Sequence, residues 1–277
     1  MILSTASPTL APGGAWLLAG VAFALYLLAA LPVARLVRLS AAALVGAFVL
    51  HLLLLVIDIG GYGQAEPGAR LGFGPVLSMT VWLVITVHTV ESRLVPVPAV
   101  RQWLGLAGAV AVLLAAVFPG ELRPLSSALA PLHFALGVGS YGLFGAAVVH
   151  ALMLDAAERR LRSGASAGRA PVPGRAMGLP LLQLERLTFR FVEAGFAVLT
   201  ATLLLGAVTA AHWRWDHKTV FSLLAWGVFA ALLVGRRLRG WRGRLATRWL
   251  YAGAVLLLLA YAGSRFVVEV LLAGGGA

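Results

Sequence analysis

The chain has 277 residues, of which 61% are hydrophobic and only 12% are charged, whereas a soluble domain is about half apolar and about a quarter charged. This composition excludes an ordinary soluble domain and indicates a membrane protein with several spans. The formal net charge of +12 does not predict nucleic-acid binding, because the basic residues stand in short clusters between apolar runs. The chain has no cysteine, which excludes disulfides and thiolate metal ligands.

Apolar runs of about 20 residues predict about eight transmembrane helices within a single membrane domain over residues 1–277. The spans are expected near residues 14–36, 40–58, 73–93, 101–118, 129–154, 186–211, 218–236 and 249–272. The first 34 residues contain no lysine or arginine, so the first run is predicted to be a retained span and not a secretory signal. The sequence therefore predicts an all-α fold, a polytopic bundle of membrane helices.

The arginines gather on one side of this predicted topology. The arginine-rich side has Arg35 and Arg38, then Arg93 and Arg101, and then the two loops over residues 155–185 and 236–248. The opposite side has only Arg70, Arg123, Arg214 and Lys218. By the positive-inside rule the first group is cytoplasmic, with residues 155–185 as a flexible loop, and both chain termini are external.

Residues 213–218, with the sequence WRWDHK, concentrate aromatic and polar side chains at the start of the seventh predicted span. Lys218 is the only lysine in the chain. Indole rings are favoured at a membrane interface, and Arg214 or Lys218 could pair with an anionic group of a ligand. Asp216 could orient a histidine or balance these cations. The alternative is an ordinary pair of interfacial tryptophans beside solvated charges.

Six histidines can be sorted by depth, because a helix rises about 1.5 Å per residue. The outward set is His51, His133, His212 and His217, and the inward pair is His88 and His150. Neutral imidazole is a common metal ligand in proteins. His133 and His150 are 17 positions apart on one predicted helix, about 25 Å in depth, so they cannot share one metal ion. Any of the intramembrane histidines could instead be a hydrogen-bonding group between helices.

Charged side chains inside the predicted spans occur as two pairs. Arg190 and Glu193 are three positions apart in the sixth span, and Arg265 and Glu269 are four apart in the eighth. This spacing allows an ion pair within each helix. Charges at membrane depth are costly and usually face the interior of a bundle.

The tryptophan segment, with Leu224 and Trp226 after it, resembles the tryptophan-rich segment of the cytochrome c assembly proteins of the CcsA/ResC/HemX type. Residues 131–134 (PLHF) and 140–144 (SYGLF) resemble the external haem-ligand histidine of that family and the helix that follows it. Residues 241–244 and 260–266 are also similar to family motifs. The resemblance covers about residues 40–270 and is closest to the small HemX-like/YpjD branch.

This resemblance implies a bacterial inner membrane protein that presents a non-covalent haem b at an external, tryptophan-rich site. It makes His133 and His51 the candidate iron ligands. The other candidate binding residues are Trp213, Trp215, Asp216, His217, Lys218 and Arg265. The expected partners are the lipid bilayer and other cytochrome c assembly proteins, and the expected role is an accessory one without catalysis by this chain.

The chain departs from the family pattern after the tryptophan segment. The family places a second external histidine near the outer end of the last helix, but residues 266–277 contain none. His133 would then need another partner, with His51, His212 and His217 as alternatives. Two other functions stay open: a scaffold or regulatory protein of the same fold without haem, and a small-solute transporter with Glu193, Arg265 and Glu269 along its path.

Overall fold

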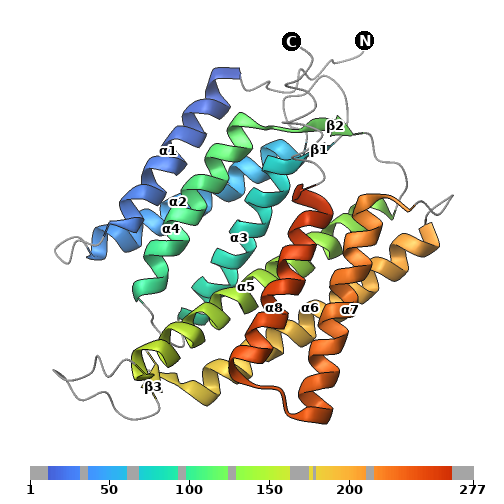
Figure 1. Ribbon diagram of the computed structural model, residues 1–277. Helices are drawn as coiled ribbons and strands as arrows, with labels where there is room; N and C mark the ends of the chain where they lie inside the picture. Colours follow the sequence, from blue (N-terminus) through green and yellow to red (C-terminus); the bar gives the residue numbers. More distant parts are fainter. Residues whose placement is uncertain are drawn as a thin grey trace, which may run out of the picture. The chain divides into compact units, whose positions relative to one another are not determined.

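The computed structural model describes residues 12–31, 37–60, 69–92, 98–123, 129–162, 175–176, 179–209 and 215–263. These residues form eight α-helices, one short π-helix and two pairs of short antiparallel strands (Figure 1). Six of the described helices are long and apolar enough to cross a membrane, and the described part of α1 is a shorter apolar helix. The prediction of an all-α, polytopic membrane bundle is confirmed.

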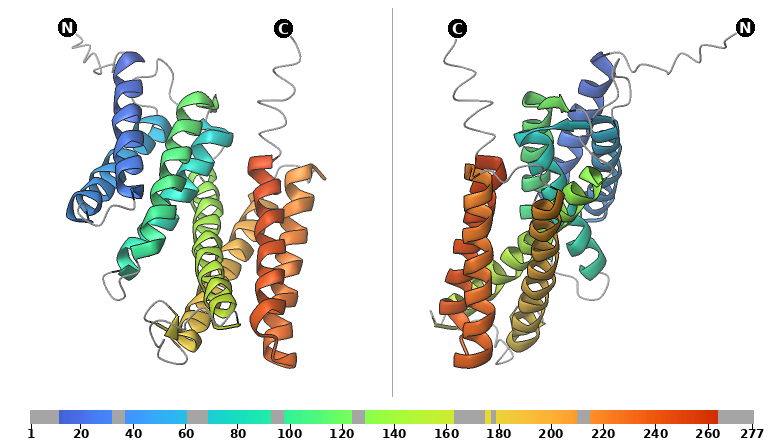
Figure 2. Two further views of the ribbon diagram at one scale, coloured as in Figure 1. Left: turned by 60° about the vertical axis from the view of Figure 1, so that its left-hand side comes forward. Right: turned by 90° about the vertical axis from the view of Figure 1, so that its right-hand side faces the viewer.

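The chain divides into two compact units, and unit 1 contains the N-terminal helices. They are α1 (Pro12–Ala30), α2 (Val37–Gly60), residues 73–85 of α3 (Phe73–Ser92) and α4 (Pro98–Val117). Helix α1 packs against both α2 and α4 (Figures 1 and 2). Strand β1 (Ala69–Leu71), just before α3, pairs with β2 (Glu121–Arg123), just after α4. This strand pair ties the two helices together at one end of the unit.

Close approach of backbones holds the helices of unit 1 together. A Cβ atom on Gly74 of α3 would lie 2.4 Å from the carbonyl oxygen of Phe118, and one on Gly108 of α4 would lie 2.6 Å from the Tyr26 ring. Small residues at such contacts allow the dense packing by which membrane helices associate. Helix α3 is also fastened to α2, because the Trp82 indole donates a hydrogen bond of 3.1 Å to the Phe48 carbonyl.

Unit 2 contains the remaining helices and the last residues of α3. Its elements are α5 (Ala130–Arg162), strands β3 (Arg175–Ala176) and β4 (Leu179–Pro180), α6 (Leu181–Thr209), α7 (His217–Arg239), α8 (Gly243–Leu258) and the π-helix η2 (Leu259–Gly263). Helices α7 and α8 run side by side in opposite directions (Figures 1 and 2). The turn between them is tight because Gly240 and Gly243 both adopt positive φ angles, 65° and 57°.

Aromatic rings against glycines form the core of unit 2. Phe144 of α5 and Phe229 of α7 stack with their ring centres 3.8 Å apart. A Cβ atom on Gly195 of α6 would lie 3.2 Å from the Phe144 ring, and one on Gly253 of α8 would lie 2.6 Å from the Phe229 ring. One pair of stacked rings therefore joins four helices, and this requires a glycine on two of them.

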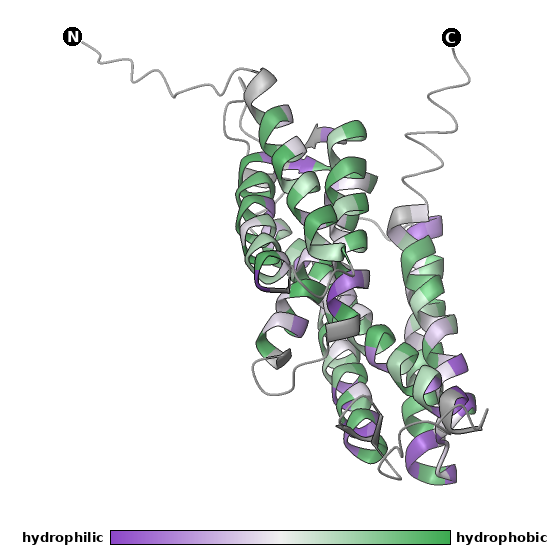
Figure 3. Cartoon of the chain, turned by 90° about the vertical axis from the view of Figure 1, so that its left-hand side faces the viewer, coloured by the Kyte–Doolittle hydropathy of each residue, from purple (hydrophilic) through white to green (hydrophobic). Residues whose placement is uncertain are grey.

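Several helices extend beyond the apolar runs that predicted them. The largest extensions are in α5, which continues to Arg162, in α6, which begins at Leu181, and in α8, which begins at Gly243. The corresponding spans were expected to end at 154, to begin at 186 and to begin at 249. Ala, Glu and Arg in these extensions are good helix formers, but they add no hydrophobicity to the run. Figure 3 shows the same division, with helices hydrophobic along most of their length and hydrophilic residues gathered toward their ends.

The expected ion pair between Arg190 and Glu193 does not form. Glu193 instead lies 3.8 Å from Arg237 of α7, and the two side chains are 48% and 76% exposed. The neighbouring Arg236 pairs with Glu185 at 3.3 Å. The partner of Glu193 was predicted wrongly from the sequence, because α7 brings arginines to α6 from another part of the chain.

The glycine contact in the core of unit 2 can be tested with Gly253→Ala. The Phe229 ring is fully buried and cannot move aside, so the added methyl group is expected to cost about 1–3 kcal/mol of stability. The midpoint of thermal unfolding of the purified protein measures this loss. The matched control is Gly227→Ala in α7, where a Cβ atom would meet nothing within 4 Å. Equal midpoints for the two variants would show that the Phe229 ring does not pack tightly against Gly253.

Candidate functional site

His133 lies on the first turn of α5, where elements from three other parts of unit 2 meet. Its ring lies against Gly206 of α6, since a Cβ atom there would fall 2.9 Å from ring carbon Cε1. The charge of Lys218, at the start of α7, acts on the ring, as does the backbone of Thr202. Lys218 Nζ also lies 5.6 Å from the centre of the Tyr261 ring in η2. We call His133, Gly206, Lys218 and Tyr261 the His133 cluster.

One nitrogen of the His133 imidazole lacks a hydrogen-bond partner. This nitrogen, Nδ1, is buried, and none of the described residues forms a hydrogen bond with it. An unpaired buried polar atom costs about 1–3 kcal/mol, so such an atom calls for an explanation. Imidazole nitrogens donate or accept hydrogen bonds or bind metal ions. The His133 cluster therefore has the chemistry of a ligand site, with one lysine to neutralise an anionic group.

A second polar contact fixes the end of α8 beside this cluster. The Tyr141 hydroxyl, two turns beyond His133 on α5, donates a hydrogen bond of 2.7 Å to the carbonyl of Leu257. The π-helix begins two residues later and places Tyr261 near Tyr141. Such π-helical turns are frequent at functional sites. The structural roles of Tyr141 and Gly206 were not predicted from the sequence, because their partners lie on other helices and the contacts depend on how the helices pack.

The tryptophan segment has a structural role that was not predicted from the sequence. Asp216 is the N-cap of α7, and its carboxylate accepts a hydrogen bond of 2.8 Å from the backbone N–H of Thr219. An Asp just before an apolar helical run is a typical signal for such a cap. Trp215 is 72% exposed and His217 is also exposed. The predicted residues that lie outside the described ranges are Trp213, Arg265, Arg214, His212 and Glu269.

His51 lies in unit 1, in the middle of α2, and is 1% exposed. Its Nδ1 is 2.9 Å from the Tyr26 hydroxyl of α1, and its Nε2 is 2.6 Å from the Ser78 hydroxyl of α3. Three helices are thus joined through one ring. Both nitrogens already have protein partners, so iron ligation by His51 would require one of these hydrogen bonds to be replaced.

The inward histidines lie among buried side chains. His150 is 3% exposed, and its Nδ1 is 2.8 Å from the Ala146 carbonyl of its own helix. His88 is 8% exposed. The hydrogen bond of His150 lies within α5, so it does not show the hydrogen bond between helices that the sequence left open as the alternative for His150.

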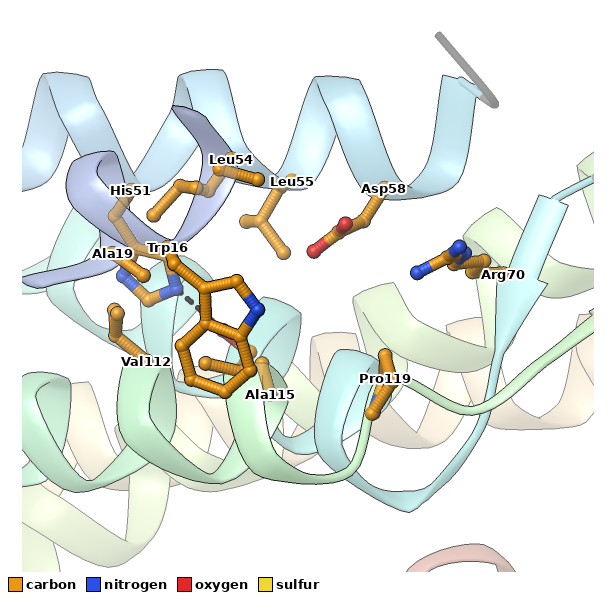
Figure 4. Close-up of a pocket in the computed structure, with 13 residues that line it drawn as sticks. Trp16, Ala19, His51, Leu54, Leu55, Asp58, Arg70, Val112, Ala115 and Pro119 are labelled. Atoms are coloured by element: carbon orange, nitrogen blue, oxygen red, sulfur yellow. Dashed lines mark hydrogen bonds between the residues drawn. The ribbon is translucent and has the colours of Figure 1, made fainter. Parts of the chain in front are cut away.

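His51 also lines a pocket of unit 1 with a volume of about 130 Å³ (Figure 4). The other polar groups on its walls are Ser78, Asp58 and Arg70. Pockets for drug-sized ligands measure about 300–1,000 Å³, so this cavity is much too small for a porphyrin. It has the size of a site for a small molecule.

Comparison with known proteins gives one family. The family model described as "Cytochrome C assembly protein" matches residues 14–272. Inner membrane protein YpjD of Escherichia coli strain K12 is 30% identical over 245 residues, which cover 84% of this chain and 88% of YpjD. Cytochrome c biogenesis protein CcsA of Gloeobacter violaceus is 35% identical over 91 residues, 31% of this chain and 27% of that protein. CcsA of Prochlorococcus marinus strain MIT 9303 is 40% identical over 86 residues, 29% and 27% of the two chains.

The hydrogen bonds of His51 can be tested with Ser78→Ala. This change leaves the buried Nε2 atom unpaired and is expected to lower stability by about 1–3 kcal/mol, measured as a lower midpoint of thermal unfolding. The control is Thr209→Val, because the exposed Thr209 hydroxyl bonds only to the Leu205 carbonyl of its own helix. A Ser78→Ala protein as stable as the control would show that the hydrogen bond of the ring to Ser78 does not stabilise the contact between α2 and α3.

Proposed function

Because the chain belongs to the cytochrome c assembly protein family, we propose that it is a haem-binding membrane protein of cytochrome c biogenesis. In this proposal it presents a non-covalent haem b at the His133 cluster, on the external face of a bacterial inner membrane. The name of YpjD, an inner membrane protein, supports the location. The names of the CcsA relatives, cytochrome c biogenesis proteins, support the process.

The observation that carries the proposal is the buried Nδ1 atom of His133, which has no hydrogen-bond partner among the described residues. It belongs to a ring of the type that ligates haem iron. The other members of the cluster fit the same group, because Lys218 can pair with a propionate and Tyr261 offers an aromatic face. A bound haem b would supply a redox-active iron, and His133 and Lys218 would hold and orient it.

The second axial ligand is proposed to be His217. This residue is exposed at the start of α7, next to Lys218 in the chain, and its imidazole makes no hydrogen bond within the described ranges. His51 is the less suitable alternative, since both of its nitrogens are engaged. The third alternative, His212, precedes the described part of the tryptophan segment.

This role is an accessory one. A cytochrome c carries haem on cysteine sulfurs, and this chain has no cysteine. The thiols and the acceptor polypeptide must therefore come from partner proteins, and this chain would hold haem for them. A bilayer-embedded component with an external site is suited to that task.

A scaffold or regulatory protein of the same fold is the second candidate function. Two observations favour it: Asp216 serves as a helix cap, and no histidine follows His217 in the chain. The transporter hypothesis has less support, because Glu193 pairs with Arg237 in a largely exposed position and does not line the pocket of unit 1.

Absorption spectra of the purified protein, oxidised and dithionite-reduced, test the haem proposal. We expect a b-type Soret band in the wild-type protein and a weaker band in His133→Ala, because an axial nitrogen is lost. The control is His150→Ala, on the same helix but about 25 Å away, which should keep the band. A full-strength band in His133→Ala would remove this residue as a ligand. A colourless wild-type protein, even after added haemin, would favour the scaffold function.

The placement of the His133 ring gives a separate prediction. In Gly206→Ala the new Cβ atom would lie 2.9 Å from Cε1 of His133, so the ring must shift while its chemistry stays intact. We expect haemin affinity to fall about tenfold, the effect of roughly 1.4 kcal/mol of strain. Haemin titration followed at the Soret maximum measures it. The control is Gly139→Ala on α5, where nothing lies within 4 Å. Identical affinities would show that Gly206 does not position the ring.

A further inference from the structure

The pocket of unit 1 is lined by two side chains of opposite charge. Asp58, near the end of α2, and Arg70, in β1, both line the cavity, and the guanidinium of Arg70 extends toward the side of the cavity where Asp58 lies (Figure 4). Their charges interact electrostatically. Within the described part of the chain, however, neither side chain makes a hydrogen bond or a direct ion pair. The two groups are therefore separated by space that a third group can fill.

The rest of the pocket is mostly apolar. Leu54, Leu55, Val112 and Ala115 line it, and the indole of Trp16 forms one wall (Figure 4). The volume of about 130 Å³ is close to that of a cavity of about 150 Å³ that holds benzene. A ligand of this site is thus a small molecule with two charged ends and a short apolar part.

We propose that this pocket binds a small zwitterion, in which a primary ammonium group and an anionic oxygen group lie a few atoms apart. The ammonium would donate hydrogen bonds to the Asp58 carboxylate. The anionic group would accept hydrogen bonds from Arg70, whose planar guanidinium matches a carboxylate or a phosphate. A ligand with only one charge would leave the opposite protein charge uncompensated in a partly buried site, which is unfavourable.

Two sources offer this chemistry. One is a free amino acid with a small apolar side chain, and the other is the ethanolamine phosphate headgroup of phosphatidylethanolamine. Trp16 is 58% exposed, and an exposed indole is favoured at the membrane interface, where either source can reach the pocket. The proposal does not depend on haem binding, because it uses residues of unit 1, whereas the His133 cluster lies in unit 2.

The experiment uses the full chain in nanodiscs of phosphatidylcholine and follows the midpoint of thermal unfolding. Phosphatidylethanolamine is added to one sample and alanine to a second, because binding to the folded state raises the midpoint. We expect one of the two to do so, and the one that does identifies the source. Phosphatidylcholine and N-acetylalanine are the matched negative ligands, since neither has an N–H-bearing ammonium to donate to Asp58.

Substitutions of the two charged residues test whether the ligand binds in this pocket. Asp58→Asn and Arg70→Gln are expected to weaken binding about tenfold or more, because each loses a charge-assisted hydrogen bond. The control is Arg248→Gln, an exposed arginine of unit 2, which should bind as the wild type does. If a variant fails to fold, the four ligands on the wild-type protein decide alone. Equal midpoints with all four ligands would overturn the proposal and leave a pocket that holds only water, as would unchanged binding by Asp58→Asn.

Discussion

Polar groups in the interior of a membrane protein have no water to pair with, so each must find its partner within the protein. Only 12% of the residues in this chain are charged. A few polar side chains therefore make the hydrogen bonds that hold the helices in position. Tyr26, His51 and Ser78 join three helices of unit 1 through one imidazole. Asp155 likewise accepts hydrogen bonds from Thr247 and Tyr251, which ties α5 to α8 in unit 2. The apolar surfaces pack around these contacts.

The same lack of solvent explains the importance of glycine. Lipid tails are as apolar as the helix surfaces, so helices associate through dense packing more than through the hydrophobic effect. Gly108 and Gly253 give this density, because each accepts an aromatic ring where a Cβ atom would collide. Gly206 likewise lies against the His133 ring, where a Cβ atom would collide with the imidazole. A packing rule of the bilayer thereby also sets the position of the candidate haem ligand.

In each unit, a candidate ligand site includes polar groups that do not follow this rule of complete pairing. In unit 2 the group is the buried nitrogen of His133, without a partner among the described residues. In unit 1 the groups are Asp58 and Arg70. Charged and polar groups at membrane depth are costly and are usually retained for a function. The two sites differ in size and chemistry, which is why they support different ligands.

The sequence by itself determined the class of fold, because a helix that crosses a membrane needs about 20 apolar residues in one continuous run. It also determined the family and drew attention to His133 and the tryptophan segment, since their types and order are local properties. It did not predict the continuation of α5 to Arg162, because Asp155, Glu158 and the arginines that follow interrupt the apolar run. Only the tertiary structure decided which groups meet: Arg237 with Glu193, Gly206 with the His133 ring, and both nitrogens of His51 with protein hydroxyls. The physical reason is that these partners lie on different helices, so their pairing depends on how the helices pack.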